Sequence, residues 1–158
     1  MGDKRGFTLI ELLIVVAIIG IIAAIAIPNL IRALQNGKQI RTLADIKSIG
    51  TGIEMYRTQV HFLPSHNSIT IAEAWATDHV LSTMTSNDII EKDGWGNDMY
   101  MISDRTIDSY SVGSAGKNGA GTVPDWSLSR GEYIVLEISD FEFDLIFCNG
   151  QYSYGPNS

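Results

Sequence analysis

The chain of 158 residues is poor in cysteine and in basic side chains, and both shortages exclude classes of protein. Its one cysteine, Cys148, cannot form an intrachain disulfide, a multi-cysteine zinc site or a haem attachment site. Lysines and arginines number 11 against 18 aspartates and glutamates, giving a net charge of −7. Because the basic residues are few and scattered, a nucleic-acid surface is excluded. The length suits one compact domain with an appendage.

Signatures of catalysis are also missing, so we expect no enzyme. The sequence contains no serine elbow, phosphate loop or Cys–His set. Its three histidines, His61, His66 and His79, show no spacing that requires a zinc site. The alternative, a membrane-anchored periplasmic enzyme, predicts a cleft with strongly perturbed ionisable groups.

What the chain does have is one long apolar run near its N-terminus. From residue 7 to residue 27 only Thr8 and Glu11 are not apolar. A helix of roughly 20 such residues spans the hydrocarbon core of a bilayer. Lys4 and Arg5 precede the run and are expected on the cytoplasmic side, which places the remainder of the chain outside.

The position of Glu11 inside this run leaves three interpretations open, because an unpaired carboxylate in a membrane costs at least a few kcal/mol. In a signal anchor, Glu11 would reach water at the membrane edge. In a cleaved secretory signal, Ala24–Ala26 would supply the small residues of the cleavage site. In the third interpretation a basic leader ends at Gly6, and cleavage leaves Phe7 as the new N-terminus.

The third interpretation is favoured by a resemblance. The stretch "RGFTLIELLIVVAIIGIIAAIAIPNL" resembles the class III signal of type IV pilins and of type II secretion pseudopilins, from Lys4 to about Leu30. The resemblance implies that a prepilin peptidase cuts between Gly6 and Phe7 and N-methylates Phe7. Glu11 would then pair with the Phe7 amine of the next subunit in a helical filament. In apolar surroundings an ammonium and a carboxylate attract strongly.

The same resemblance implies a layout and a location. Residues 1–6 form the cleaved leader, residues 7–30 the membrane and filament-core helix, and residues 31–158 the globular domain with the second half of the helix. Pro28 belongs to the assembly segment and predicts a kink or local unwinding over residues 24–28. Before assembly the chain would cross the inner membrane once, with its globular domain in the periplasm. Afterwards it would lie in a periplasmic or extracellular filament. The implied partners are other copies, the peptidase, an assembly platform and ATPase, and minor pilins or pseudopilins.

Beyond Pro28 the helical pattern continues as an amphipathic helix. Apolar residues recur at steps of three or four, with polar residues between them. They are Leu30, Leu34, Leu43, Ile46, Ile49, Ile53, Tyr56 and Val60. This stripe is expected to pack against the globular domain.

From Phe62 onward, turn residues and short alternating runs predict an α+β domain, an antiparallel sheet packed on the long helix in the manner of a pilin fold. "LPSHNS" reads as a turn, and Thr70 caps a helix over Ile71–Leu81. "DGWGNDMYMIS" and "DSYSVGS" predict a hairpin, with alternation at Met99, Met101, Tyr110 and Val112. "GEYIVLEIS" and "FEFDLIFCNGQYSYG" predict two or three more strands, with "CNGQ" as a type I′ turn.

A second resemblance covers the globular part. Asp93–Asn97 ("DGWGN"), Tyr110–Gly116 ("YSVGSAG") and Asp125 with Trp126 are similar to blocks of the major, G-type pseudopilins of type II secretion. The implied function is a structural subunit whose polymerisation drives export of folded proteins. The alternative is the major pilin of a type IV pilus, serving adhesion or motility. The strand-like tail after Arg130 favours the pilin, whereas the missing disulfide favours the pseudopilin.

In that family the glycine-rich loop binds Ca²⁺, an ion that takes six to eight oxygen ligands. The resemblance implies Asp125 as the carboxylate ligand, with the carbonyls of Val112 and Ser114 and the hydroxyl of Ser127. Ala115 stands where an aspartate is expected, so the alternative is a loop that binds no ion. Asp104 and Asp108 of the hairpin are further candidate ligands.

Overall fold

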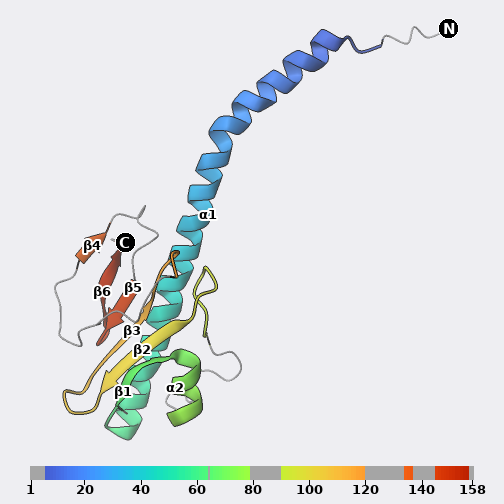
Figure 1. The fold of residues 1–158 in the computed structure, drawn as a ribbon. Helices are drawn as coiled ribbons and strands as arrows, with labels where there is room; N and C mark the ends of the chain where they lie inside the picture. The colour runs from blue at the N-terminus through green and yellow to red at the C-terminus, as the bar shows by residue number, and fades with distance from the viewer. Residues whose placement is uncertain (1–5, 64, 79–89, 120–133, 137–144, 157–158) are drawn as a thin grey trace. The chain divides into compact units, whose positions relative to one another are not determined.

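A computed structural model describes residues 6–63, 65–78, 90–119, 134–136 and 145–156 (Figure 1). The chain forms two compact units, Met1–Gln35 and Asn36–Ser158. The elements are α1 (Leu9–Val60), β1 (His66–Thr70), α2 (Ile71–Asp78), β2 (Met99–Asp104), β3 (Ser109–Ser114), β4 (Ile134–Leu136), β5 (Leu145–Cys148) and β6 (Gln151–Pro156).

The first unit consists mainly of the apolar start of α1. Every large apolar side chain from Phe7 to Leu34 is at least 45% exposed. By length and composition this helix is apolar enough to cross a membrane. A helix that is apolar on all sides requires lipid or other protein around it.

The α-helix runs through Pro28 without interruption. Of the kink or local unwinding predicted over residues 24–28, the unwinding is therefore wrong, and the kink stays a prediction. Proline removes one backbone donor, and the remaining hydrogen bonds of a 52-residue helix keep the conformation on both sides of it.

The second unit is an α+β domain, as predicted, with the C-terminal half of α1 beside β1, β2 and β3 (Figure 1). The described strands form one sheet in the order β1-β2-β3-β5-β6-β4. Neighbouring strands are antiparallel except for β4 and β6, which are parallel. The sheet was predicted to be antiparallel throughout. The exception arises because β5 lies between β4 and β6 in the sequence and runs in the opposite direction to β6, so β4 and β6 run the same way.

The core lies between α1 and the β2–β3 hairpin. The predicted alternation is confirmed in β2, whereas in β3 every residue is buried, because β3 lies between β2 and β5 in the sheet. Met99, Met101, Tyr110 and Val112 are fully buried. The α1 residues that pack with them are Ile46, Ile49 and Ile53, flanked by Leu43 and Tyr56. Of the predicted stripe, Leu30 and Leu34 remain exposed, because they belong to the apolar first unit.

The predicted turn at "LPSHNS" is partly wrong, since β1 begins at His66 and pairs with β2. Polar side chains suit this strand because it forms the edge of the described sheet, where the backbone supplies the pairing. The start of α2 is confirmed as a capping box. The Thr70 hydroxyl accepts from the Glu73 N–H at 3.2 Å, and the Thr70 N–H donates to the Glu73 carboxylate at 3.0 Å. Residues 79–81 of the predicted helix lie outside the described residues.

The predicted turn between β5 and β6 is confirmed. Asn149 and Gly150 both have positive φ, 46° and 86°, as a type I′ turn requires. The Asn149 side chain also accepts from the Tyr110 N–H at 3.0 Å and donates to the Ser109 hydroxyl at 2.6 Å. The turn is thereby fastened to β3.

Candidate functional site

The start of α1 holds Glu11 in a second capping box. The Thr8 N–H and hydroxyl donate to one Glu11 carboxylate oxygen at 2.9 and 2.7 Å, and the Glu11 N–H donates to the Thr8 hydroxyl at 3.4 Å. In a single chain the carboxylate is therefore held by its own helix start. The sequence analysis did not assign Thr8, although the spacing T-x-x-E is the signature of this motif.

Gly6 and Phe7 precede the first helical residue, and both are exposed. The Phe7 ring is 78% exposed, and no atom lies within 4 Å of the position that a Gly6 side chain would take. The bond between them thus lies in exposed, non-helical chain, with Phe7 four residues before Glu11.

A second group of polar contacts surrounds Asp93, which is 4% exposed. One carboxylate oxygen accepts from the Trp95 N–H at 2.9 Å and the Asn97 N–H at 2.8 Å. The other accepts from the Ser114 hydroxyl at 2.7 Å and, more distantly, from the Asn97 side-chain amide at 3.5 Å. Gly96, with φ of 93°, lets the chain turn so that these donors converge.

This turn is fastened to α1 through Gly94. Its N–H donates to the Thr42 hydroxyl at 2.8 Å, and that hydroxyl donates to the Lys38 carbonyl at 2.9 Å. A Cβ at Gly94 would overlap the Lys38 carbonyl oxygen. Glycine is thus required here for the close approach of two backbones.

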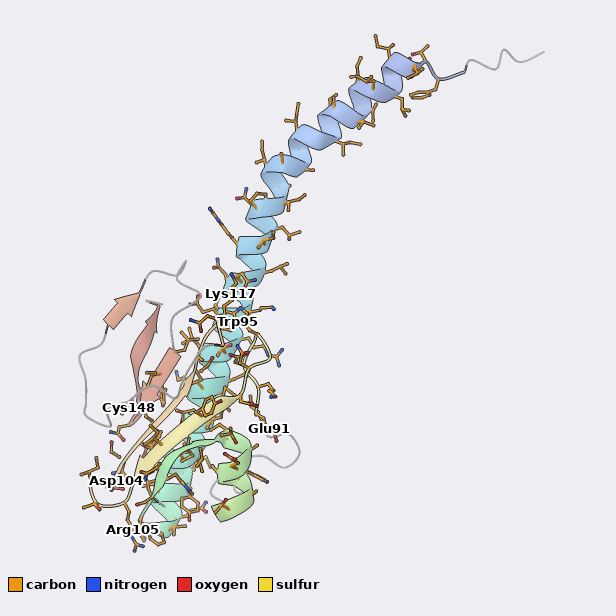
Figure 2. All side chains as sticks on the ribbon, viewed as in Figure 1. Glu91, Trp95, Asp104, Arg105, Lys117 and Cys148 are labelled. Atoms are coloured by element: carbon orange, nitrogen blue, oxygen red, sulfur yellow. The ribbon has the colours of Figure 1, made fainter. Side chains whose placement is uncertain are left out.

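The turn also holds the loop that follows β3. The Asn97 side-chain amide donates to the Gly116 carbonyl at 2.8 Å, and the Gly116 N–H donates to the Ser114 hydroxyl at 3.0 Å. Trp95 and Lys117, labelled in Figure 2, mark the two segments that meet. The blocks Asp93–Asn97 and Tyr110–Gly116, distant in sequence, form one connected site.

The expected calcium residues are only partly described. Val112 lies within β3 with a strand on each side, so its backbone groups face the sheet ladder. Ser114, whose carbonyl was the other expected ligand, is the last residue of β3 and pairs with Met99 and Leu145, while its hydroxyl is engaged by Asp93 and Gly116. Asp125 and Ser127 lie outside the described residues, so their role stays a prediction.

The two further candidates on the hairpin do not reach this loop. Asp104 pairs with Ser109 at the opposite end of the hairpin from Ser114, as Figure 2 shows for Asp104 and Trp95. The Asp104 carboxylate accepts from the Thr106 N–H, and Asp108 pairs with Arg57. Their suggested contribution to the loop is therefore wrong, because the register of β2 and β3 separates them from it.

Within Asn36–Ser158, the described titratable groups with shifted pKa values serve packing and ion pairs. Burial, aided by the charge of Glu54, raises the pKa of Tyr110, whose hydroxyl donates to the Gly50 carbonyl at 3.1 Å. A hydrogen bond to Asp108 raises the pKa of Arg57 at the end of α1. Within the described ranges no group of three or more His, Cys, Asp or Glu side chains is placed to hold a metal ion.

The chain has an apolar helix exposed on all sides, with Glu11 in the capping box of its first turn, and this helix continues into an α+β domain. This is the architecture of a pilin-like filament subunit. Residues 1–27 match the family of the prokaryotic N-terminal methylation motif. Residues 29–125, more than half of the chain, match the type II secretion system protein G family. The chain belongs to the type II secretion system protein G family.

Relatives agree with this assignment. Type II secretion system core protein G of Escherichia coli (strain K12) is 29% identical over 136 residues, covering 80% of this chain and 94% of the relative. That of Pseudomonas aeruginosa is 30% identical over 131 residues, covering 74% and 88%. The type IV major pilin protein PilA of Myxococcus xanthus is 60% identical, but over 48 residues that cover 30% of this chain and 22% of the relative. The pseudopilin is thereby favoured over the pilin. No solved structure matches this chain.

Proposed function

We propose that this chain is the repeating subunit of a pseudopilus whose growth moves folded proteins out of the periplasm. The observation that carries the proposal is the exposed apolar surface from Phe7 to Leu34. It is suited first to the bilayer and then to the interior of a helical filament of copies. Membership of the protein G family supports the use of that filament in secretion.

Processing prepares the subunit. A prepilin peptidase cuts the exposed, non-helical bond between Gly6 and Phe7, and the new amine of Phe7 is methylated. The match to the N-terminal methylation motif supports this step. Lys4 and Arg5 keep the leader on the cytoplasmic side, so the domain after Pro28 lies in the periplasm.

Glu11 then selects the position of the next subunit. In a single chain its carboxylate accepts hydrogen bonds from Thr8, and the stretch from Phe7 to Ile27 contains no basic residue that would neutralise its charge. The ammonium of Phe7 on a neighbouring copy supplies that cation. Pairing the two charges removes the cost of burying either one alone, and it fixes the axial register between copies.

The role of the chain is structural. An assembly platform and ATPase elsewhere in the secretion apparatus supply the work of extraction, and minor pseudopilins accompany this subunit in the filament. The protein G family match and the exposed helix support a building block rather than an enzyme.

Substitution of Glu11 tests the pairing. Glutamine at helix position N3 still closes a capping box, whereas it is neutral and cannot form an ion pair with an ammonium. Both Glu11→Gln and Glu11→Ala chains are therefore expected to insert into the membrane and to be cleaved normally. Both should give at least about tenfold fewer filaments than the wild type, because a loss of about 1.4 kcal/mol at each contact between copies corresponds to a factor of ten. The measurement is sheared-filament yield beside intact mass of the membrane-bound chain.

The matched control is Glu73→Gln in the capping box of α2, which should assemble normally. Normal filament yield from Glu11→Gln, with loss only in Glu11→Ala, would show that capping and not charge is what assembly requires. Retention of the six-residue leader in either variant would instead place the defect in processing.

A further inference from the structure

The hydrogen bonds around Asp93 have a consequence for how the loop after β3 is held. An ionised carboxylate offers about four acceptor positions. Those of Asp93 face four donors: two backbone N–H groups, the Ser114 hydroxyl and the Asn97 amide. The buried charge is thus satisfied entirely by donors, without a cation among these contacts.

These contacts join three separate segments. Gly94 fastens the turn to Thr42 on α1, while Asn97 reaches the Gly116 carbonyl beyond β3. Gly119 packs so closely on Asn97 that a Cβ there would lie 2.8 Å from the Asn97 amide oxygen. The loop over residues 114–119 is therefore fixed to the helix through side chains of the turn.

The described part of the expected calcium site does not fit the ion. Calcium requires six to eight oxygen atoms turned toward it. Of the expected ligands, Val112 and Ser114 both pair with β2 and with β5, so their backbone groups face the sheet ladder. The Ser114 hydroxyl is engaged by Asp93 and Gly116, and the Gly116 carbonyl accepts from Asn97. Position 115, where the resembled family has an aspartate, holds an alanine that is 4% exposed.

We propose that Asp93 is the anchor of the loop after β3, and that in this chain, with alanine at position 115, these hydrogen bonds hold the loop without a bound calcium ion. The globular domain folds, and the filament assembles, without calcium. The proposal concerns how the domain holds its shape, so it stands or falls independently of the pairing of Glu11.

Thermal unfolding of the full chain in detergent, in millimolar calcium and in EDTA, tests it. The wild type is expected to unfold at the same temperature in both, within about 1 °C. Asp93→Asn places an amide among donors, so Tm should fall by about 5 °C or more, equally in both solutions. A wild-type Tm that calcium raises by several degrees overturns the proposal.

Asn97→Asp is the sharper variant, because it distinguishes an anchor from an ion site without requiring a severe loss of packing. A carboxylate at position 97 cannot donate to the Gly116 carbonyl, and it lies beside Asp93. The proposal predicts a lower Tm that calcium does not restore. Recovery of the wild-type Tm in calcium would contradict it, because two adjacent carboxylates would then be shown to bind the ion.

Asp98→Asn serves as the control. Asp98 is a neighbouring carboxylate that pairs with Lys92 near the surface, and its loss should change Tm by no more than about 1 °C. Filament yield in calcium-free medium gives a second readout. It should equal the yield in calcium-containing medium, and a loss without calcium would overturn the proposal.

Discussion

At the scale of single residues, two threonine–glutamate pairs begin helices in this chain, and their surroundings give them different roles. Thr70 and Glu73 cap α2 beside the sheet, where the pair stabilises a helix start. Thr8 and Glu11 make the same bonds at the head of an exposed apolar helix. That helix must be covered by lipid or protein, and under the proposed pairing the charge on Glu11 makes the position of the covering copy specific.

A buried tyrosine gives a prediction at this scale. Tyr110 is fully buried, and its hydroxyl joins β3 to the backbone of α1 at Gly50. Tyr110→Phe should lower the free energy of unfolding by about 1 kcal/mol, the usual contribution of one buried hydrogen bond. Denaturant unfolding of the full chain in detergent measures this loss.

Tyr56→Phe is the matched control for that variant. Tyr56 packs against the same core from α1, and no hydrogen bond of its hydroxyl is found among the described residues. Its loss should change the free energy of unfolding by less than about 0.5 kcal/mol. Equal effects of the two variants would contradict the role given to the Gly50 contact.

At the scale of elements, the close contact between α1 and the Asp93 turn depends on Gly94. Any side chain there meets the Lys38 carbonyl, and backbone cannot move aside as a flexible side chain can. Gly94→Ala should therefore lower the free energy of unfolding by about 1–3 kcal/mol, as overpacked sites do.

Gly37→Ala controls for the effect of replacing glycine itself. Gly37 lies in α1 with nothing within 4 Å of its would-be Cβ. Alanine there should stabilise the helix by up to about 1 kcal/mol. The two substitutions are thus predicted to have opposite signs, and destabilisation by both would show that the turn does not depend on the close approach.

The same elements show what the sequence could and could not predict. Alternation at Met99, Met101, Tyr110 and Val112 predicted the hairpin, because period two places these side chains on one buried face. β1 escaped prediction because an edge strand forms through backbone pairing and needs no apolar pattern. The parallel pairing of β4 with β6 is likewise a matter of topology, which local sequence does not encode.

The candidate site also has parts with a recognisable sequence pattern and parts without one. Thr8 and the Asp93–Asn97 turn had readable signals, a T-x-x-E spacing and a run of turn residues. The residues that these segments contact had no such pattern. The hydrogen bond from Gly94 to Thr42 joins residues 52 apart in sequence, and the one from Asn97 to Gly116 joins residues 19 apart. Such contacts are set by packing of the whole domain.

At the scale of the whole molecule, the tail is part of the domain, although the protein G match ends at residue 125. β5 pairs directly with β3, and Phe147 lies in the core, where only a glycine at position 50 leaves room for it. The three strands β4, β5 and β6 therefore extend the sheet, and the domain does so with a single, buried cysteine rather than a disulfide.

The measurement that tests the account most directly is the protein content of medium and periplasm in a strain lacking this chain, compared with its parent and with the strain complemented by the wild-type chain. Folded enzymes should accumulate in the periplasm while surface fibres persist, and complementation should restore secretion. Unchanged secretion together with loss of a surface fibre would contradict the account and identify the filament as a type IV pilus.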